Sequence, residues 1–376
     1  MITSIIRNIF RVNLGVKKSE RVLIFTDTLS PSENIDLIEI NRRLKLKDIA
    51  YFTSETGNIF AKEVILCEFP ATGSHGAEPP LELWKIAFGQ KAVTELNKNR
   101  ILDLILNKKA DDTHIKKAEE ILGKFKKDAV DAVIALSNFS TSHTRFRDLL
   151  TRICGTRYAS MPLFEMSMFE GPMNVDWRQL EKITKKIVRK LGKAEKIEIM
   201  TENGTKISFS VKGRKAEADT GILTEAGSFG NLPAGEAYLA PLEGTSNGRL
   251  VLEWAPTRAL ETPLTLIVKN GYVKDIIGDE EYAKQLRIKL SERQENGNIA
   301  ELGIGTNSMA KRPDNILESE KIMGTIHIAL GDNSSFGGSI KTPFHQDFVF
   351  FMPTVKLFDK DYRRTVLMQK GKFAAD

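Results

Sequence analysis

Residues 300–351 read AELGIGTNSMAKRPDNILESEKIMGTIHIALGDNSSFGGSIKTPFHQDFVFF. Within this stretch, GTIHIAL (324–330) and FHQDFVFF (344–351) are short apolar runs separated by a segment rich in glycine, serine and asparagine. Such runs predict two neighbouring β-strands. Each run contains one of the chain's five histidines, His327 and His345. The stretch therefore predicts a β-sheet that carries imidazole side chains.

The two-residue period of a strand determines which side chains share a face with each histidine. In the first run, His327 shares a face with Thr325 and Ala329, and in the second His345 shares a face with Asp347. An imidazole and a carboxylate on one strand face are typical of a metal site. A single histidine is more often a hydrogen-bonded core residue. Two histidines and an aspartate on adjacent strands favour the metal site.

The first half of the chain has the pattern of an α/β domain. Apolar runs at 21–26, 62–67 and 131–137 predict strands, and a lysine-rich region at about 91–127 predicts helix. Strands that alternate with helices indicate an open, mostly parallel sheet. We assign this α/β domain to residues 1–190.

The second half changes to closely spaced strand-like runs. These runs alternate with glycine turns, and Asn270-Gly271 lies between two of them as a hairpin signal. One predicted helix interrupts the series at 280–295. We therefore expect residues 191–376 to form a β-rich, mainly antiparallel domain that binds metal and carries catalysis.

The composition of the 376 residues limits the classes of function. The net charge is +6, but the lysines fall mainly on amphipathic helices among glutamates, which predicts solvated faces rather than a nucleic-acid surface. No apolar run is long enough for a membrane helix, so no membrane partner is expected. The two cysteines, Cys67 and Cys154, lie far apart and fit a reducing cytoplasm.

Two glutamates complete the set of candidate ligands. Glu236 ends NLPAGE, and Glu301 begins ELGIGTN. With HIALG and the final His-x-Asp, these motifs resemble the thermophilic-type metalloaminopeptidases, the aminopeptidase T and aminopeptidase S family, which are leucyl aminopeptidase-like enzymes. The resemblance extends over the whole chain in layout, but its specific motifs all lie in the second half.

That resemblance implies a metal-dependent hydrolase. It implies an α/β domain, a β-rich domain with two divalent metal ions per chain (Zn²⁺, Co²⁺ or Mn²⁺), and a homodimer. Matched residue by residue, the implied metal ligands are Glu236, Glu301, His327, His345 and Asp347. The expected activity is removal of N-terminal residues from peptides with a free N-terminus. Either glutamate, Glu236 or Glu301, is expected to act as the catalytic proton shuttle.

One departure from the family keeps a second function open. The family has a tyrosine shortly after HIALG, whereas this chain has Ser334 at the corresponding position and Phe336 nearby. A dihydroxypyridine dioxygenase is similar to the same family. In that alternative, His327, His345 and Asp347 hold one Fe(II) as a triad of two histidines and one carboxylate. A third interpretation is a non-catalytic binding protein, which the retained ligand set disfavours.

Overall fold

The computed structural model describes residues 2–30, 33 and 35–374. The chain divides into two compact units, Met1–Trp177 with Gly221–Pro233, and Arg178–Thr220 with Ala234–Asp376. Within the described part, no helix has both the length and the apolar character that crossing a membrane requires.

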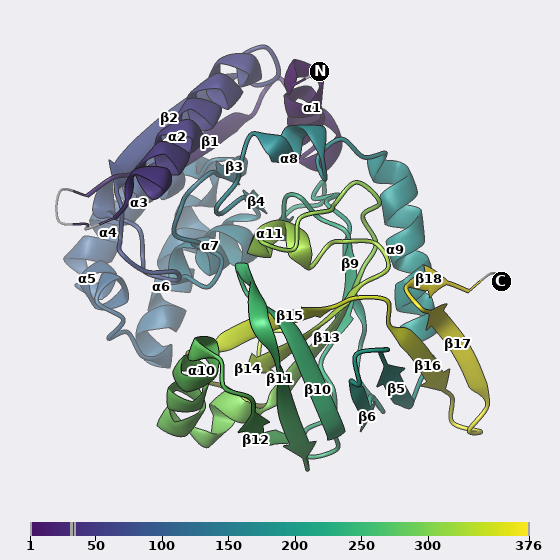
Figure 1. Cartoon of the computed structure of the whole chain (residues 1–376). Helices are drawn as coiled ribbons and strands as arrows, with labels where there is room; N and C mark the ends of the chain where they lie inside the picture. The colour runs from purple at the N-terminus through teal and green to yellow at the C-terminus, as the bar shows by residue number, and fades with distance from the viewer. Residues whose placement is uncertain (1, 31–32, 34, 375–376) are drawn as a thin grey trace. The chain divides into compact units, whose positions relative to one another are not determined.

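The first unit is built on a five-stranded parallel sheet of order β2-β1-β3-β4-β8 (Figure 1). All four residues of β3 are buried, as the apolar run at 131–137 predicts for a strand inside a parallel sheet. Helical segments complete the unit, and its core contains Leu23, Trp84, Phe146 and Tyr158. The elements are α1 (Ile2–Asn8), η1 (Ile9–Asn13), β1 (Arg21–Thr28), α2 (Leu37–Gly57), β2 (Glu63–Pro70), α3 (Leu81–Phe88), α4 (Gln90–Lys98), α5 (Ile101–Leu106), α6 (Asp112–Phe125), η2 (Lys126–Asp128), β3 (Ala132–Ala135), α7 (Arg145–Leu149), η3 (Leu150–Cys154), β4 (Arg157–Ser160), α8 (Ser167–Glu170) and β8 (Phe229–Asn231).

The second unit contains two antiparallel sheets. The larger has the order β12-β11-β10-β6-β5-β16-β17-β18, and the smaller has the order β15-β14-β13-β9-β7 (Figure 1). The elements are α9 (Trp177–Leu191), β5 (Lys196–Met200), β6 (Lys206–Ser210), β7 (Glu217–Asp219), β9 (Glu236–Leu239), β10 (Asn247–Ala255), β11 (Arg258–Lys269), β12 (Tyr272–Ile277), α10 (Glu281–Glu292), η4 (Gln294–Gly297), β13 (Ile299–Gly305), α11 (Ile316–Ser319), β14 (Ile326–Gly331), β15 (His345–Phe350), β16 (Thr354–Phe358), β17 (Arg364–Gln369) and β18 (Lys372–Phe373).

One apolar core joins the two sheets of the second unit. It contains Ile197 and Leu252 from the larger sheet and Ile304 and Ile328 from the smaller one. Because strand side chains alternate, β14 directs Ile326, Ile328 and Leu330 into this core and His327 to the opposite face. The predicted fold class, an α/β unit with a parallel sheet followed by a β-rich antiparallel unit, is confirmed.

The chain passes between the units more than once. Residues 190 and 191, where the sequence places the boundary, lie inside α9. The short strand β8 pairs in parallel with β4, so Gly221–Pro233 belongs to the first unit although β7 and β9 on either side belong to the second. A three-residue strand has too short a pattern to be recognised in the sequence.

The hairpin predicted at Asn270-Gly271 is present between β11 and β12. Both turn residues have positive φ, 52° at Asn270 and 83° at Gly271, as a two-residue turn of this type requires. A Cβ added to Gly271 would lie 2.5 Å from the backbone nitrogen of Gly244. The turn therefore needs glycine both for its conformation and for the close approach of a second loop.

We expect Gly271→Ala to destabilise the protein by about 2–4 kcal/mol, since it combines a left-handed backbone with a steric clash. Gly213→Ala is the matched control, because Gly213 also has positive φ (73°) but no atom within 4 Å of an added Cβ. The control should lose only about 1 kcal/mol. Denaturant unfolding of both variants measures the difference, and equal losses would show that the Gly244 contact contributes nothing.

Candidate metal centre

Four strands of the small sheet place the predicted site residues on one face. Glu236, at the start of β9, pairs with Gly305 of β13, and Glu301 of β13 pairs with Ala329 of β14. Ala329 in turn pairs with Asp347 of β15. His327 and His345 lie on β14 and β15 in the same alternation. The structure therefore brings together all five residues that the sequence singles out.

Small residues between these side chains leave room for them. Gly303 of β13 lies opposite His327 on one side and Tyr238 on the other. A Cβ at Gly303 would overlap the imidazole ring of His327. Ala329 separates Glu301 from Asp347 with a single methyl group. The imidazole and the carboxylates can thus lie over the sheet rather than being pushed away from it.

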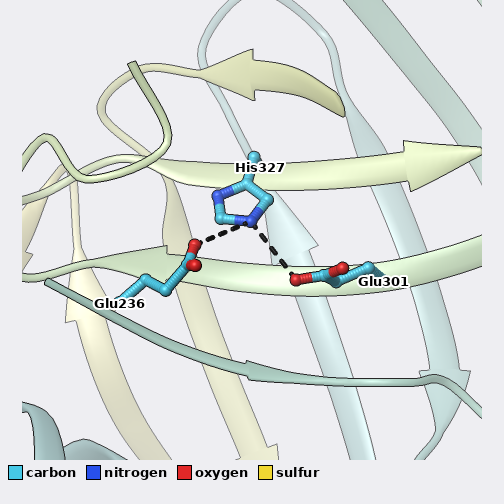
Figure 2. A group of neighbouring side chains, drawn as sticks. All are labelled: Glu236, Glu301 and His327. Atoms are coloured by element: carbon cyan, nitrogen blue, oxygen red, sulfur yellow. Dashed lines mark ion pairs between the residues drawn. The ribbon is translucent and has the colours of Figure 1, made fainter. Parts of the chain in front are cut away.

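His327, Glu236 and Glu301 form the first of two groups. Nε2 of His327 lies 3.2 Å from Oε2 of Glu236 and 3.5 Å from Oε1 of Glu301. Figure 2 shows one ring nitrogen directed at both carboxylates. All three residues are buried, and the His327 side chain is only 1% exposed.

His345, Glu301 and Asp347 form the second group. Nε2 of His345 lies 3.4 Å from Oε2 of Glu301 and 3.5 Å from Oδ2 of Asp347. Nδ1 of His345 lies 2.8 Å from the carbonyl oxygen of Asp332 and donates a hydrogen bond to it. In the neutral ring the Nε2 lone pair therefore faces the two carboxylates, the usual arrangement of a ligand histidine. The His345 side chain is 29% exposed, so this group is the more accessible one.

The chemistry of the two groups fits divalent metal ions. In each group one ligand atom per residue lies within 4.8 Å of the others, and Glu301 belongs to both groups. Oε2 of Glu236 and Oδ1 of Asp347 are buried without a hydrogen-bond partner in the described part of the chain. Buried polar atoms without partners are costly, and a cation would satisfy these oxygens. Nitrogen and oxygen ligands without sulfur suit Zn²⁺, Co²⁺, Mn²⁺ or Fe²⁺.

The triad of two histidines and one carboxylate expected for the alternative function is not one of these two groups. Among the described residues, His327 groups with Glu236 and Glu301, while His345 groups with Glu301 and Asp347. Each group thus has one histidine and two carboxylates. The cause is the strand register: Glu301 and Asp347 both pair with Ala329, so the carboxylate of Glu301 lies between the two imidazoles.

The carboxylates govern the protonation of both histidines. Burial alone lowers the pKa of His327, but Glu301, Glu236 and Asp347 outweigh it and raise that pKa to about 9. Burial also lowers the pKa of His345, but the charges of Asp347 and Glu301 outweigh this effect and raise that pKa to about 10. Burial raises the pKa of Glu301, yet its contacts with both imidazoles lower it to about 2. Without metal, the site is therefore an array of imidazolium–carboxylate pairs.

A buried lysine that the sequence analysis missed adjoins the first group. Lys321 is 0% exposed, and its Nζ lies 2.5 Å from Oε1 of Glu236, 3.3 Å from Glu320 and 3.8 Å from Asp219. Burial raises the pKa of Glu320 to about 8, and the charge of Asp347 adds to this. Nothing in SEK (319–321) predicts burial, because lysine and glutamate in a loop are normally solvated.

Aromatic rings border the second group. Phe336 contacts His345 edge-on, with centroids 6.0 Å apart, and contacts Tyr238 at 5.9 Å. Ser334, at the position of the family tyrosine, bonds to the Asp332 carboxylate at 3.0 Å and belongs to the turn. Asp332 lies outside both metal-compatible groups. Phe336 and Tyr238 thus supply the aromatic surface beside the site.

We expect metal to change how stability depends on pH. The folded metal-free protein raises both imidazole pKa values above 6.5, so this stabilisation is complete below about pH 6.5 and is lost as pH rises through about 9–10. A bound ion requires each imidazole that it binds to be neutral, and it removes the part of the dependence that this imidazole contributes. Melting temperatures from about pH 6 to about pH 11, with chelator and with Zn²⁺, test this. Parallel curves under the two conditions would contradict it.

Comparisons with known proteins agree with the fold and identify a family. The family model for NicX, 2,5-dihydroxypyridine 5,6-dioxygenase, matches residues 108–374. A solved structure of 2,5-dihydroxypyridine dioxygenase from Pseudomonas putida KT2440 has 18% identity and a TM-score of 0.69, with 100% of this chain and 97% of that chain covered. Wild-type AmpT from Thermus thermophilus has 14% identity and a TM-score of 0.57, covering 100% and 99%. No curated protein sequence matches significantly.

These comparisons favour the alternative over the main prediction. The similarity to AmpT supports the predicted aminopeptidase-like fold, and at this identity it supports the fold alone. The family model spans well over half of the chain and includes every strand that carries the metal centre. The chain belongs to the 2,5-dihydroxypyridine 5,6-dioxygenase family of enzymes.

Proposed function

We propose that this protein is a ring-cleaving dioxygenase that uses one Fe(II) ion to open a dihydroxylated, nitrogen-containing aromatic ring. The observation that carries the proposal is the family match across residues 108–374, the region that contains the whole metal centre. The matched family is named for 2,5-dihydroxypyridine, and we take this compound as the first substrate to test.

Glu301, His345 and Asp347 are the residues that would hold the ion. Their group is more open than the first, because the His345 side chain is 29% exposed whereas that of His327 is 1% exposed. A substrate needs such access in order to reach the metal. Bound Fe(II) would supply the redox chemistry that allows O₂ to react with a stable aromatic ring.

The surrounding side chains suit a flat, hydroxylated substrate. Phe336 and Tyr238 lie edge-on to neighbouring rings near His345, and such surfaces bind aromatic molecules by stacking or edge contacts. Oε2 of Glu236 has no hydrogen-bond partner and can accept a proton from a ring hydroxyl. Glu320, whose pKa is raised to about 8, holds a proton near neutral pH. Binding and proton transfer thus both have candidate residues.

The second candidate function is the metalloaminopeptidase. The observation in its favour is that Glu301 offers one oxygen to each of two three-residue groups, an arrangement suited to two ions. Two Zn²⁺, Co²⁺ or Mn²⁺ ions would then activate water, and Glu236 or Glu301 would move the proton. The substrates would be peptides with a free N-terminus. For either activity, a cytoplasmic homodimer remains our prediction.

Parallel assays distinguish the two functions. The protein is stripped of metal, loaded anaerobically with Fe²⁺, and supplied with 2,5-dihydroxypyridine while O₂ consumption is recorded. A second sample receives Zn²⁺, Co²⁺ or Mn²⁺ with free and N-acetylated peptides. We expect O₂ uptake with Fe²⁺ that is abolished by chelator. Cleavage of free peptides, with no O₂ uptake, would replace the dioxygenase by the aminopeptidase.

We expect His345→Ala and Asp347→Asn to lower metal affinity by more than about 100-fold, because each removes a direct ligand. Activity should vanish in both variants, while the metal-free proteins stay folded. Gln346→Ala is the matched control, since Gln346 lies between them on β15 and faces away. Isothermal titration and the shift in melting temperature on adding metal measure the effect. Unchanged metal binding in both variants would remove this strand from the site.

A further inference from the structure

The two metal-compatible groups differ in the cation beside them. Glu236 of the first group has its Oε1 2.5 Å from the ammonium of Lys321. Within the described residues, no lysine or arginine lies within 4.0 Å of the carboxylates of Glu301 or Asp347. The first group therefore already has a positive charge at one of its ligands, and the second has only its imidazoles.

Lys321 cannot withdraw to solvent. Its side chain is 0% exposed, and its ammonium is enclosed by Glu236, Glu320 and Asp219. The backbone fixes it as well, because the carbonyl of Lys321 accepts a hydrogen bond from Asn307 N at 2.9 Å. The next residue packs so tightly on Gly305 that a Cβ there would overlap the Ile322 carbonyl. Gly305 is also the strand partner of Glu236, so the lysine is fixed relative to that ligand.

We propose that Lys321 takes the place of a second metal ion, so that only the group of Glu301, His345 and Asp347 binds a divalent cation. This inference rests on the proposed one-ion function and adds the residue that sets the ion count. A divalent ion on Oε2 of Glu236 would lie next to a fixed ammonium in a buried setting. There, the repulsion between the two cations is weakly screened.

The same arrangement explains why a set of ligands suited to two ions would bind only one ion. All five residues of the dinuclear set are present, and their order on the sheet is compatible with two ions that share Glu301. Lys321 neutralises Glu236 without supplying a Lewis acid. Glu236 then remains as a fixed carboxylate beside the metal rather than a ligand of it.

Ion counts in charge-altering variants test the inference. Wild type, Lys321→Met, Lys321→Arg and the double variant Lys321→Met/Glu320→Gln are dialysed against Mn²⁺ or Zn²⁺, and the bound metal is measured by elemental analysis. We expect one ion per chain in wild type and in Lys321→Arg. We expect two in Lys321→Met, with affinity at the first group improved on the order of 100-fold. An exchange-coupled Mn²⁺ resonance signal should appear only when two ions bind.

Controls separate charge from folding. Lys289→Met removes an exposed lysine that pairs with Glu292 and should still bind one ion. If Lys321→Met folds only with excess metal, the second ion is replacing the lost charge, which supports the inference. If Lys321→Met stays unfolded even with metal, the double variant decides. Two ions in that variant support the inference, and one ion overturns it.

The result is distinguishable from failure of the proposed function. Two equally tight ions in wild type, or one ion in folded Lys321→Met, would overturn the role of Lys321. The O₂-uptake assay of the wild type answers the separate question of activity. One ion in wild type and two in Lys321→Met, without ring cleavage, would keep the role of Lys321 and remove the dioxygenase.

Discussion

Glu301 offers one carboxylate oxygen to each of the two imidazoles, and the candidate centre depends on this sharing. Oε1 faces His327 at 3.5 Å and Oε2 faces His345 at 3.4 Å. The carboxylate can reach both because it projects from β13, where its strand neighbour on β14 is Ala329. A larger residue at 329 would fill the space between the groups. The sharing also lowers the pKa of Glu301 to about 2, so it stays ionised despite its burial.

The two groups are similar in composition and different in surroundings. The group of His327 is buried and adjoins a buried ammonium, whereas the group of His345 is partly exposed and adjoins an aromatic side chain. In our proposals, Lys321 beside the first group limits the number of bound ions, and Phe336 beside the second group contacts the substrate.

The metal-free centre concentrates negative charge, which must be compensated for the sheet to fold. Five carboxyl groups, those of Asp219, Glu236, Glu301, Glu320 and Asp347, gather in a small volume, and the repulsion between the ionised ones disfavours folding. Lys321 and the two imidazoles compensate in the metal-free protein. A bound ion would displace the proton of the imidazole that it binds and take over the compensation from that imidazole. Metal binding would thus be thermodynamically linked to the folding of the small sheet.

Local sequence patterns predict the fold class, which the structure confirms, and they predict that His327, His345 and Asp347 are candidate ligands. Alternation in the runs at 324–330 and 344–351 is a local property, so the faces of His327, His345 and Asp347 follow from it. The Asn270-Gly271 hairpin and the buried strand at 131–137 can also be predicted, because each follows from residues that are neighbours in the sequence. The division of the candidate ligands into two groups cannot be predicted from the sequence, because strand register sets which side chains are neighbours across a sheet. The burial of Lys321 is likewise visible only in the structure. It depends on contacts with Asp219 and Glu236, which lie roughly a hundred residues away in the chain.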